Sequence, residues 1–264
     1  MIETVFDSAA AHYAEVSPLL WGPIGEATVA AAGIRPGERV LDVCCGAGAS
    51  AVPAAEAAGA QGHVDAVDLA GALLAHGRRR ADGLRNVRFV QADVTTWEAQ
   101  DGLPYDVVQC VHGVFFLPDM DASVTRLAGL LRPGGRLVVT TWAQGAMEAF
   151  GRLFAEAVAR VRETPTAPPA GSEAASRLAT EEGLAAWLTG LGLTRATVTR
   201  APLRIPLDDA LAWQVVLGSG FRGMLTGLPD AAVDRVRVTF DHLLAERDTR
   251  ELDATSLIGA GLRP

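Results

Sequence analysis

The residues best suited to ligand chemistry lie in one short segment, Val40–Gly48, which combines a carboxylate with two closely spaced glycines. The segment reads VLDVCCGAG, so Asp42 stands four residues before the first glycine of the turn Gly46-Ala47-Gly48. Glycines in such a turn let the backbone bend sharply and let a ligand approach without a Cβ in the way. A helix that begins near Ala49 would direct free N–H groups and a partial positive charge at the same place. The segment therefore predicts a ligand site at the end of a buried strand.

The same segment also fits a second type of site, the dinucleotide pattern G-x-G-x-x-A, with Asp68 about 20 residues further on for a ribose hydroxyl. Asp42 separates the two interpretations, because its carboxylate would repel a pyrophosphate but can receive an ammonium group directly or through water. Asp93 and Val94 end another strand-like run, where the carboxylate could accept a hydrogen bond from an adenine amino group. These residues favour an adenosine compound that carries an ammonium group.

Five short apolar runs would position these residues as strands. They are Arg39–Cys45, His63–Leu69, Val87–Asp93, Tyr105–Val111 and Arg136–Trp142. Helical segments lie between the runs, and the clearest of them follows Pro118. Its apolar residues at helical spacing are Met120, Val124, Leu127 and Leu131, and Arg132-Pro133-Gly134-Gly135 ends it. Strands that alternate with helices predict βαβ units, and hence a parallel sheet covered on both faces.

The pattern changes after Trp142. Residues 163–173 predict a Pro-rich loop, and an amphipathic helix with Leu184, Trp187, Leu188 and Leu191 follows. Thr194–Ile205 and Leu252–Leu262 predict two more strands, with helices between them. We expect one domain over 1–264, made of an N-terminal helical cap (1–35), a cofactor-binding core (36–142) and a substrate-side part (143–264) with a helical insertion at about 208–246.

Taken together, the motifs resemble class I S-adenosylmethionine-dependent methyltransferases, closest to the ubiquinone/menaquinone C-methyltransferase-like group. VLDVCCGAG matches the first motif of that family, Val67-Asp68-Leu69 the second, Gln91-Ala92-Asp93 the third and LLRPGGRLVV the motif of the fifth strand. Phe6-Asp7 and Tyr13 fit its N-terminal signature, so the match covers about residues 5–142. The resemblance implies an α/β, Rossmann-like fold: a mostly parallel seven-stranded sheet with helices on both faces and a helical cap.

The resemblance also assigns cofactor contacts by position. Gly46 and Gly48 would pass under the methionine and ribose, with Asp42 near the ammonium group and Tyr13 closing over the methionine end. Asp68 would bind the ribose hydroxyls, Leu69 would pack on the adenine, and Asp93 and Val94 would lie at its amino edge. The full predicted set is Tyr13, Asp42, Gly46, Ala47, Gly48, Asp68, Leu69, Asp93, Val94, Cys110 and Val111. Each of the three carboxylates has a structural alternative, in which it caps backbone N–H groups.

Two histidines are candidates for catalysis, and each has a second interpretation. His112 follows the fourth strand, where an imidazole could deprotonate a hydroxyl, an amine or a carbon acid, or could instead position the cofactor carboxylate or the loop. The matching position in the family usually carries an apolar or aromatic residue. His12 lies beside Tyr13 and is either a second candidate base or a surface histidine.

The predicted acceptor pocket combines aromatic residues with one arginine. Trp21, Phe115, Phe116 and Phe221 are its candidates, although aromatic side chains are core residues by default. Arg222 could bind an acidic group of the acceptor through a bidentate contact, or lie on the surface. No cluster in the sequence has zinc or hard-cation ligand spacing, so we expect no metal.

The function implied is methyl transfer from S-adenosylmethionine to a small-molecule acceptor in natural-product metabolism, with S-adenosylhomocysteine as the product. The sequence does not distinguish oxygen, nitrogen and carbon acceptors. The alternative is a methyltransferase-fold cyclase that keeps the cofactor as a scaffold for a pericyclic reaction. A cofactor-sensing subunit without catalysis is a third interpretation, and the intact motifs argue against it.

Composition limits the partners and the compartment. The net charge of −8 and the pI near 5.1 argue against binding to a phosphate backbone, so no nucleic-acid partner is expected. Cys44, Cys45 and Cys110 fit reduced core thiols. The first residues, MIETVFDSAA, lack the basic start of a secretory signal, and no run approaches the roughly 18 apolar residues of a membrane span. We expect a cytoplasmic protein without a membrane partner, and a homodimer is compatible with the sequence.

Overall fold

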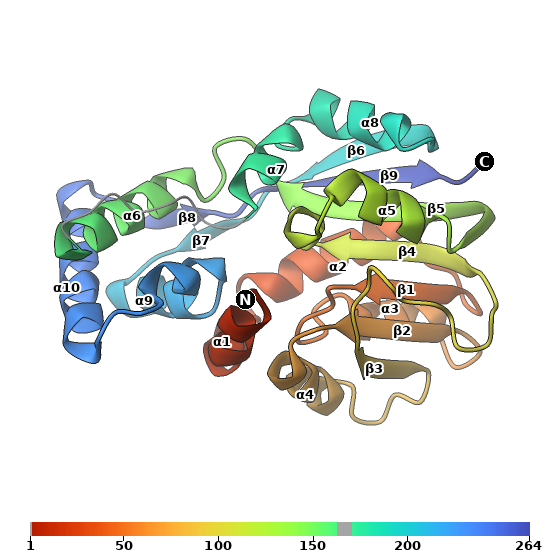
Figure 1. Ribbon diagram of the computed structural model, residues 1–264, viewed down its shortest axis with the longest axis horizontal. Helices are drawn as coiled ribbons and strands as arrows, with labels where there is room; N and C mark the ends of the chain where they lie inside the picture. Colours follow the sequence, from red (N-terminus) through yellow and green to blue (C-terminus); the bar gives the residue numbers. More distant parts are fainter. Residues whose placement is uncertain (1, 163–170) are drawn as a thin grey trace.

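A seven-stranded sheet runs through the molecule in the order β3-β2-β1-β4-β5-β9-β6 (Figure 1). The structure is a computed structural model and describes residues 2–162 and 171–264. Its strands are β1 (Arg39–Val43), β2 (His63–Asp68), β3 (Val87–Gln91), β4 (Tyr105–Val111), β5 (Leu131–Trp142), β6 (Thr194–Ala201), β7 (Arg204–Pro206), β8 (Glu251–Asp253) and β9 (Ser256–Leu262). The first five strands pair in parallel, and β9 pairs antiparallel with both β5 and β6. The predicted α/β fold with a mostly parallel seven-stranded sheet is confirmed.

Helices cover both faces of this sheet. They are α1 (Ile2–Val16), α2 (Trp21–Ala32), α3 (Ala51–Ala58), α4 (Gly71–Arg80), η1 (Val114–Phe116), α5 (Met120–Ala128), α6 (Glu148–Arg162), α7 (Ser172–Arg177), α8 (Glu181–Gly190), α9 (Asp209–Leu217), η2 (Gly220–Leu225) and α10 (Asp230–Glu246). One core joins α2, α3 and α4 to one face, and another joins α5 and α8 to the other. The side chains that precede α5, α8 and α9 act as N-caps, because each accepts a hydrogen bond from the first turn of its helix; they are Asp119, Thr180 and Asp208.

A separate hydrophobic core lies beyond one end of the sheet. It is formed by α6, α9, η2 and α10 with the short antiparallel pair β7–β8, and we call this part the cap. Figure 1 shows the cap helices α6, α9 and α10 to one side of the sheet, with α1 between the cap and α4. Trp21 of α2 and Trp142 at the end of β5 pack against this core, so the cap rests on the carboxyl ends of the central strands.

Both of the last two predicted strands are divided in the structure. Thr194–Ile205 forms β6 and β7, and Leu252–Leu262 forms β8 and β9, because both segments leave the large sheet at the same level to enter the cap. Ala201 and Ser256 are the last paired residues there. The predicted continuous strands over these ranges are therefore wrong.

Other predicted boundaries also shift. The predicted strands His63–Leu69 and Val87–Asp93 end at Asp68 and Gln91, and no helix lies among the described residues 92–104 between β3 and β4, where a helical segment was predicted. The first strand ends at Val43 and not at Cys45, because Cys44 adopts a left-handed conformation with φ of 56°. The helix after Pro118 ends at Ala128, and Leu131 begins β5 opposite Tyr105, with a register shift that accommodates the Pro-Gly-Gly segment. Of the predicted loop 163–173, residues 163–170 lie outside the described residues, and α7 already begins at 172.

Candidate functional site

The glycine turn after β1 adopts the backbone conformation that its sequence predicts. Gly46 and Gly48 have φ of 52° and 76°, in the left-handed region that favours glycine. A Cβ on Gly46 would lie 3.1 Å from the Tyr13 hydroxyl, and one on Gly48 would lie 2.9 Å from the Phe89 ring. The turn therefore needs glycines both for its conformation and for its close neighbours, and it offers backbone atoms to a ligand.

Asp68 joins the end of β2 to this turn. Its Oδ2 accepts a hydrogen bond from Gly46 N at 2.8 Å, and its Oδ1 accepts one from Ala70 N at 2.8 Å. Burial raises the pKa of Asp68, and these backbone N–H groups oppose the rise. The capping role is therefore present in the structure. Each carboxylate oxygen keeps a second lone pair, so the ribose contact stays a prediction.

The residue after Asp68 faces solvent. Leu69 is 41% exposed, so its apolar surface is free for an adenine ring to pack on. That contact stays a prediction.

Asp42 lies fully buried beneath the turn. Its Oδ2 accepts a hydrogen bond from Ser50 Oγ at 2.7 Å, and its Oδ1 has no hydrogen-bond partner among the described residues. Its register partner on β4 is Gln109, which is also fully buried. Burial raises the pKa of Asp42 to about 7, against the hydrogen bond from Ser50 and the influence of the Gln109 amide. The contact of Asp42 with the ammonium group, direct or through water, stays a prediction.

Helix α1 covers the glycine turn. Phe6 and Tyr13 pack on a small cluster that contains Ala47. Asp7 accepts a hydrogen bond from Ala72 N, in the first turn of α4, at 2.9 Å. The N-terminal signature thus holds α1 across the turn, and Tyr13 lies beside Gly46. Its contact with the methionine end of the cofactor stays a prediction. Burial and the nearby Asp68 raise the pKa of the Tyr13 hydroxyl well above its ordinary value, so it remains protonated.

The remaining predicted cofactor residues follow β3 and end β4. Asp93 is exposed, and its Oδ1 accepts hydrogen bonds from the backbone and side chain of Thr95 at 2.8 and 2.7 Å, while Val94 is buried. Cys110 is buried beside Cys44, in keeping with core thiols, and Val111 packs against the core of the cap. The adenine contact predicted for Asp93 and Val94 stays a prediction.

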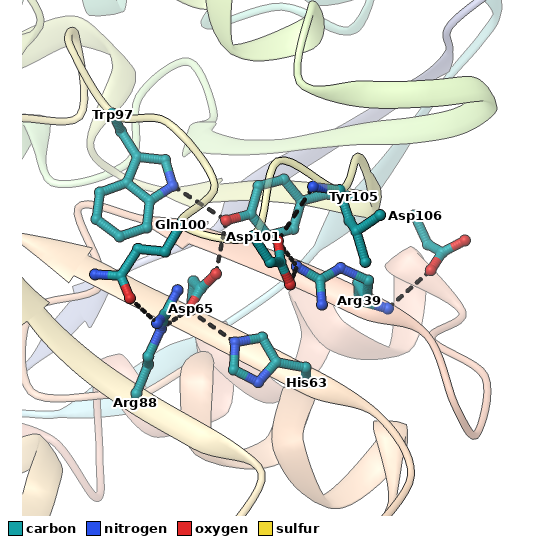
Figure 2. Close-up of polar contacts among 10 residues, drawn as sticks. Arg39, His63, Asp65, Arg88, Trp97, Gln100, Asp101, Tyr105 and Asp106 are labelled. Carbon is teal, nitrogen blue, oxygen red and sulfur yellow. Dashed lines mark hydrogen bonds and ion pairs between the residues drawn. The ribbon is translucent and has the colours of Figure 1, made fainter.

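A buried network supports the segment that follows Asp93 (Figure 2). Asp65 of β2 is fully buried and accepts hydrogen bonds from Tyr105 Oη at 2.6 Å, from His63 at 2.9 Å and from Arg88. Tyr105 Oη in turn accepts one from Trp97 Nε1 at 3.1 Å. The network holds the loop 92–104 against β2, β3 and β4. The adenine is expected on this side of the sheet.

His112 follows β4 and is almost enclosed. It is 8% exposed, has φ of 51°, and donates its backbone N–H to Thr140 O at 2.9 Å. Its ring stacks on Trp142 with centroids 3.8 Å apart and planes at 26°, and its Nε2 is 3.1 Å from Ser256 Oγ. Burial lowers the pKa of His112 to about 3.

Two of the predicted pocket residues, Trp21 and Phe115, lie against His112, and Phe116 lies against Phe115. Trp21 approaches the His112 ring edge-on at 6.2 Å and stacks on Tyr13 at 5.1 Å. Phe115 is 6.4 Å from His112 and 4.8 Å from Phe116. An aromatic group therefore extends from the α1 residue above the glycine turn to the end of β5.

The contacts of Phe221, Arg222 and His12 lie elsewhere. Phe221 packs against Phe150 and Phe154 inside the cap, and Arg222 Nε donates to Ser8 Oγ at 2.9 Å at the edge of a cavity of about 300 Å³. His12 is half-buried, and its backbone carbonyl packs closely on Gly218 of the α9–η2 turn. Their predicted roles would require a ligand that reaches the cap, and they stay predictions.

Four residues of this site were not anticipated as functional: Ser50, Gln109, Trp142 and Ser256. Ser256 and Gln109 are fully buried or nearly so, and each lies beside a predicted site residue on a neighbouring strand. For Gln109 a signal exists, since an amide inside an apolar strand is unusual. For Ser256 the sequence offers no such signal, because its contact with His112 depends on how β9 pairs in the sheet.

Two further findings concern the described part of the chain. Within residues 2–162 and 171–264, no group of three or more His, Cys, Asp or Glu side chains is arranged to bind a metal ion. In the same ranges, no helix is both long and apolar enough to cross a membrane.

The comparison with known proteins agrees with these features. Residues 40–135 match the family described as "Methyltransferase domain". The chain is 34% identical over 145 residues to aklanonic acid methyltransferase DauC of Streptomyces sp. strain C5, a match that covers 53% of this chain and 64% of that protein. It is 28% identical over 123 residues to a demethylmenaquinone methyltransferase of Staphylococcus aureus, covering 47% of this chain and 51% of that protein.

Among solved structures, the YcgJ protein of Bacillus subtilis has the same fold. It superposes with a TM-score of 0.57 at 17% identity, over 91% of this chain and 97% of that one. The chain spans about half to two thirds of the length of the curated relatives it matches. The resemblance inferred from the motifs is confirmed: residues 40–135 match the methyltransferase domain family, and the two relatives above are named as methyltransferases.

Proposed function

We propose that this protein transfers the methyl group of S-adenosylmethionine to a small-molecule acceptor in natural-product metabolism. The observation that supports it most directly is the glycine turn with Asp68 at one side of the aromatic group around His112. A polar nucleotide site and an apolar, aromatic site thus lie at neighbouring strand ends, which is where open α/β sheets bind ligands.

The bound cofactor would supply an electrophilic methyl group on a sulfonium. The task of the protein is then to align the acceptor atom behind the S–CH₃ bond and to exclude water. Tyr13, Trp21 and Trp142 provide an apolar surface for that purpose. Burial lowers the pKa of His112 to about 3 and makes it a weak base, which supports a positioning role over the abstraction of a proton.

Two observations, one on the relatives and one on the site, support the proposed acceptor class. DauC is named as a methyltransferase of aklanonic acid, a small molecule, and it matches more than half of this chain. The aromatic group around His112 would suit an acceptor with apolar, ring-containing structure. Neither relative described above is named as a cyclase.

The test uses the whole protein with methyl-labelled S-adenosylmethionine and a panel of small aromatic metabolites. We expect label to appear in an organic product and S-adenosylhomocysteine to form in equal amount. S-adenosylhomocysteine should also bind with a measurable heat and raise the melting temperature, whereas NAD should not. A thermal shift with NAD alone, or an acceptor converted to product without label, would overturn the proposal.

A further inference from the structure

The contacts of Ser256 indicate which nitrogen of His112 carries the proton. A serine hydroxyl has a single hydrogen, and Ser256 Oγ donates it to Ala254 O at 3.3 Å. The same oxygen is 3.1 Å from His112 Nε2. With the hydroxyl hydrogen directed at Ala254 O, the oxygen is the acceptor and His112 Nε2 is the donor. Burial keeps the ring neutral, and a neutral imidazole carries one proton, so Nδ1 has a free lone pair.

That lone pair is buried without a partner. His112 Nδ1 has no hydrogen-bond partner in the described ranges 2–162 and 171–264, and the side chain is more than nine-tenths buried. A buried acceptor atom is costly to leave unpaired, and such atoms in folded proteins usually meet a ligand, an ion or a water. The surroundings of Nδ1 are aromatic: Trp142 lies against the ring, and Trp21 and Phe115 lie at its edges.

His112 lies between the cofactor turn and the cap, which are the two parts that a methyl transfer must bring together. β4 lies between β1, which carries the glycine turn, and β5, which ends at Trp142 beside the core of the cap. A group held at His112 would therefore have the cofactor turn on one side and the cap on the other.

We propose that Nδ1 of His112 accepts a hydrogen bond from a hydroxyl or N–H group of an uncharged aromatic acceptor and so selects that class over carboxylates. A hydroxyl donates to the lone pair. A methyl ether has no hydrogen to donate, and a carboxylate would place its own lone pairs and negative charge against Nδ1. The inference rests on the proposed methyl transfer and narrows its acceptor class.

The test compares three probes that share one ring: phenol, anisole and benzoate. Their binding is measured by ¹⁵N NMR on histidine-labelled full-length protein with saturating S-adenosylhomocysteine. The His112 resonances are assigned by their loss in His112→Phe, which keeps an aromatic ring against Trp142. We expect an Nε2-protonated ring with unprotonated Nδ1, and a shift of Nδ1 when phenol is added. Phenol should bind about tenfold more tightly than anisole or benzoate, the effect of one hydrogen bond.

The variants separate the hydrogen bond from packing. In His112→Phe the preference for phenol should fall to within about threefold, while binding of anisole is retained. His112→Asn places an amide oxygen near the position of Nδ1 and tolerates the left-handed backbone, so it should restore part of the preference. Ser256→Ala removes the acceptor for Nε2–H and should weaken the preference through loss of the single tautomer.

The contrary results are equally definite. An Nδ1-protonated ring, equal binding of the three probes, tighter binding of benzoate, or no shift with phenol up to the concentration that unfolds the protein would each overturn the inference. If S-adenosylhomocysteine itself gives no heat and no thermal shift, the proposed function fails instead. Labelled methyl transfer to other acceptors without a phenol preference leaves the proposed function standing and removes this inference alone.

Discussion

At the scale of single residues, the site depends on two side chains with unusual backbone conformations at neighbouring strand ends. Cys44 directly follows β1 with φ of 56°, and His112 directly follows β4 with φ of 51°. A residue with a Cβ is less stable there than glycine by roughly 1–2 kcal/mol. At His112 the stacking on Trp142 and the hydrogen bond to Ser256 offset this cost. The conformation turns the imidazole towards β5 and β9.

Asp68 is the residue on which cofactor affinity should depend most. Replacing it with alanine would remove the charge-assisted hydrogen bonds predicted to the ribose and the support of Gly46 N. We expect a loss of about 2–4 kcal/mol in the binding free energy of S-adenosylhomocysteine, measured by calorimetry.

The control for Asp68→Ala is Glu156→Gln, which removes the same charge from an exposed ion pair with Arg160 on α6. It should leave affinity unchanged. Melting temperatures of both variants show whether folding survives. Parent-like affinity in folded Asp68→Ala would show that the ribose assignment is wrong.

Asp42 should make stability depend on pH. Its pKa is raised from 3.8 to about 7 in the folded state, so its stabilising contribution is complete below about pH 4 and is lost as pH rises through 7. An asparagine side chain at this position would be neutral at every pH and could still accept from Ser50. In urea unfolding, Asp42→Asn should be more stable than the parent at pH 8, by on the order of 2–4 kcal/mol, and similar to it near pH 4. An equal difference at both pH values would contradict the burial of a charged carboxylate.

At the scale of elements, the buried network around Asp65 should stabilise the junction of β2, β3 and β4. Tyr105→Phe keeps the buried ring but removes a hydrogen bond to a charged carboxylate. We expect a loss of about 1.5–3 kcal/mol in the free energy of unfolding at pH 7, measured with urea. Hydrogen bonds from Arg88, Tyr105 and His63 lower the pKa of Asp65, so its contribution is present above its unfolded pKa and is lost as pH falls through the folded value.

The matched control for Tyr105→Phe is Trp97→Phe. This variant removes the neutral hydrogen bond from Trp97 to Tyr105 Oη and some ring area. Acid unfolding of Tyr105→Phe should begin at higher pH than that of Trp97→Phe. If both variants respond to acid alike, Tyr105 does not stabilise the charged form of Asp65.

The elements differ in how well the sequence predicts them. Most of the parallel strands are buried runs, so local pattern and motif identify them, and Tyr105–Val111 is predicted to the residue. The division of Thr194–Ile205 and Leu252–Leu262 is not predictable in this way, because each half is strand-like alone and the bend depends on docking of the cap. In the site, Asp68 and the glycines follow from motifs. The Nε2–Ser256 contact depends on which strand pairs with β5, which no local pattern specifies.

At the scale of the whole molecule, α1 connects the part that carries the glycine turn with the cap. It contacts α4 beside the glycine turn on one side and α9 and η2 of the cap on the other (Figure 1). Tyr13 and Phe6 cover the turn, so a cofactor must enter under or past this helix. We expect hydrogen exchange of α1 amides to be fast in the free protein and slowed by S-adenosylhomocysteine.

Exchange in α10 provides the internal reference, because that helix packs on α6 and lies away from the turn. Its amides should respond little to the cofactor. Equal protection of α1 with and without cofactor would mean that the helix does not open for binding.

The position of β9 in the sheet affects the order in which the parts of the site form during folding. β9 lies between β5 and β6, and Ser256 is 144 residues from His112 in sequence. Contacts over such separations form slowly, because a long loop must close first. The glycine turn, Asp68 and α4 lie close together in sequence and can form much earlier. Refolding followed in parallel by S-adenosylhomocysteine binding and by His112 NMR should show cofactor affinity returning first. The chain would then pass through a stage that binds its cofactor while His112 still lacks the hydrogen bond that determines its tautomer.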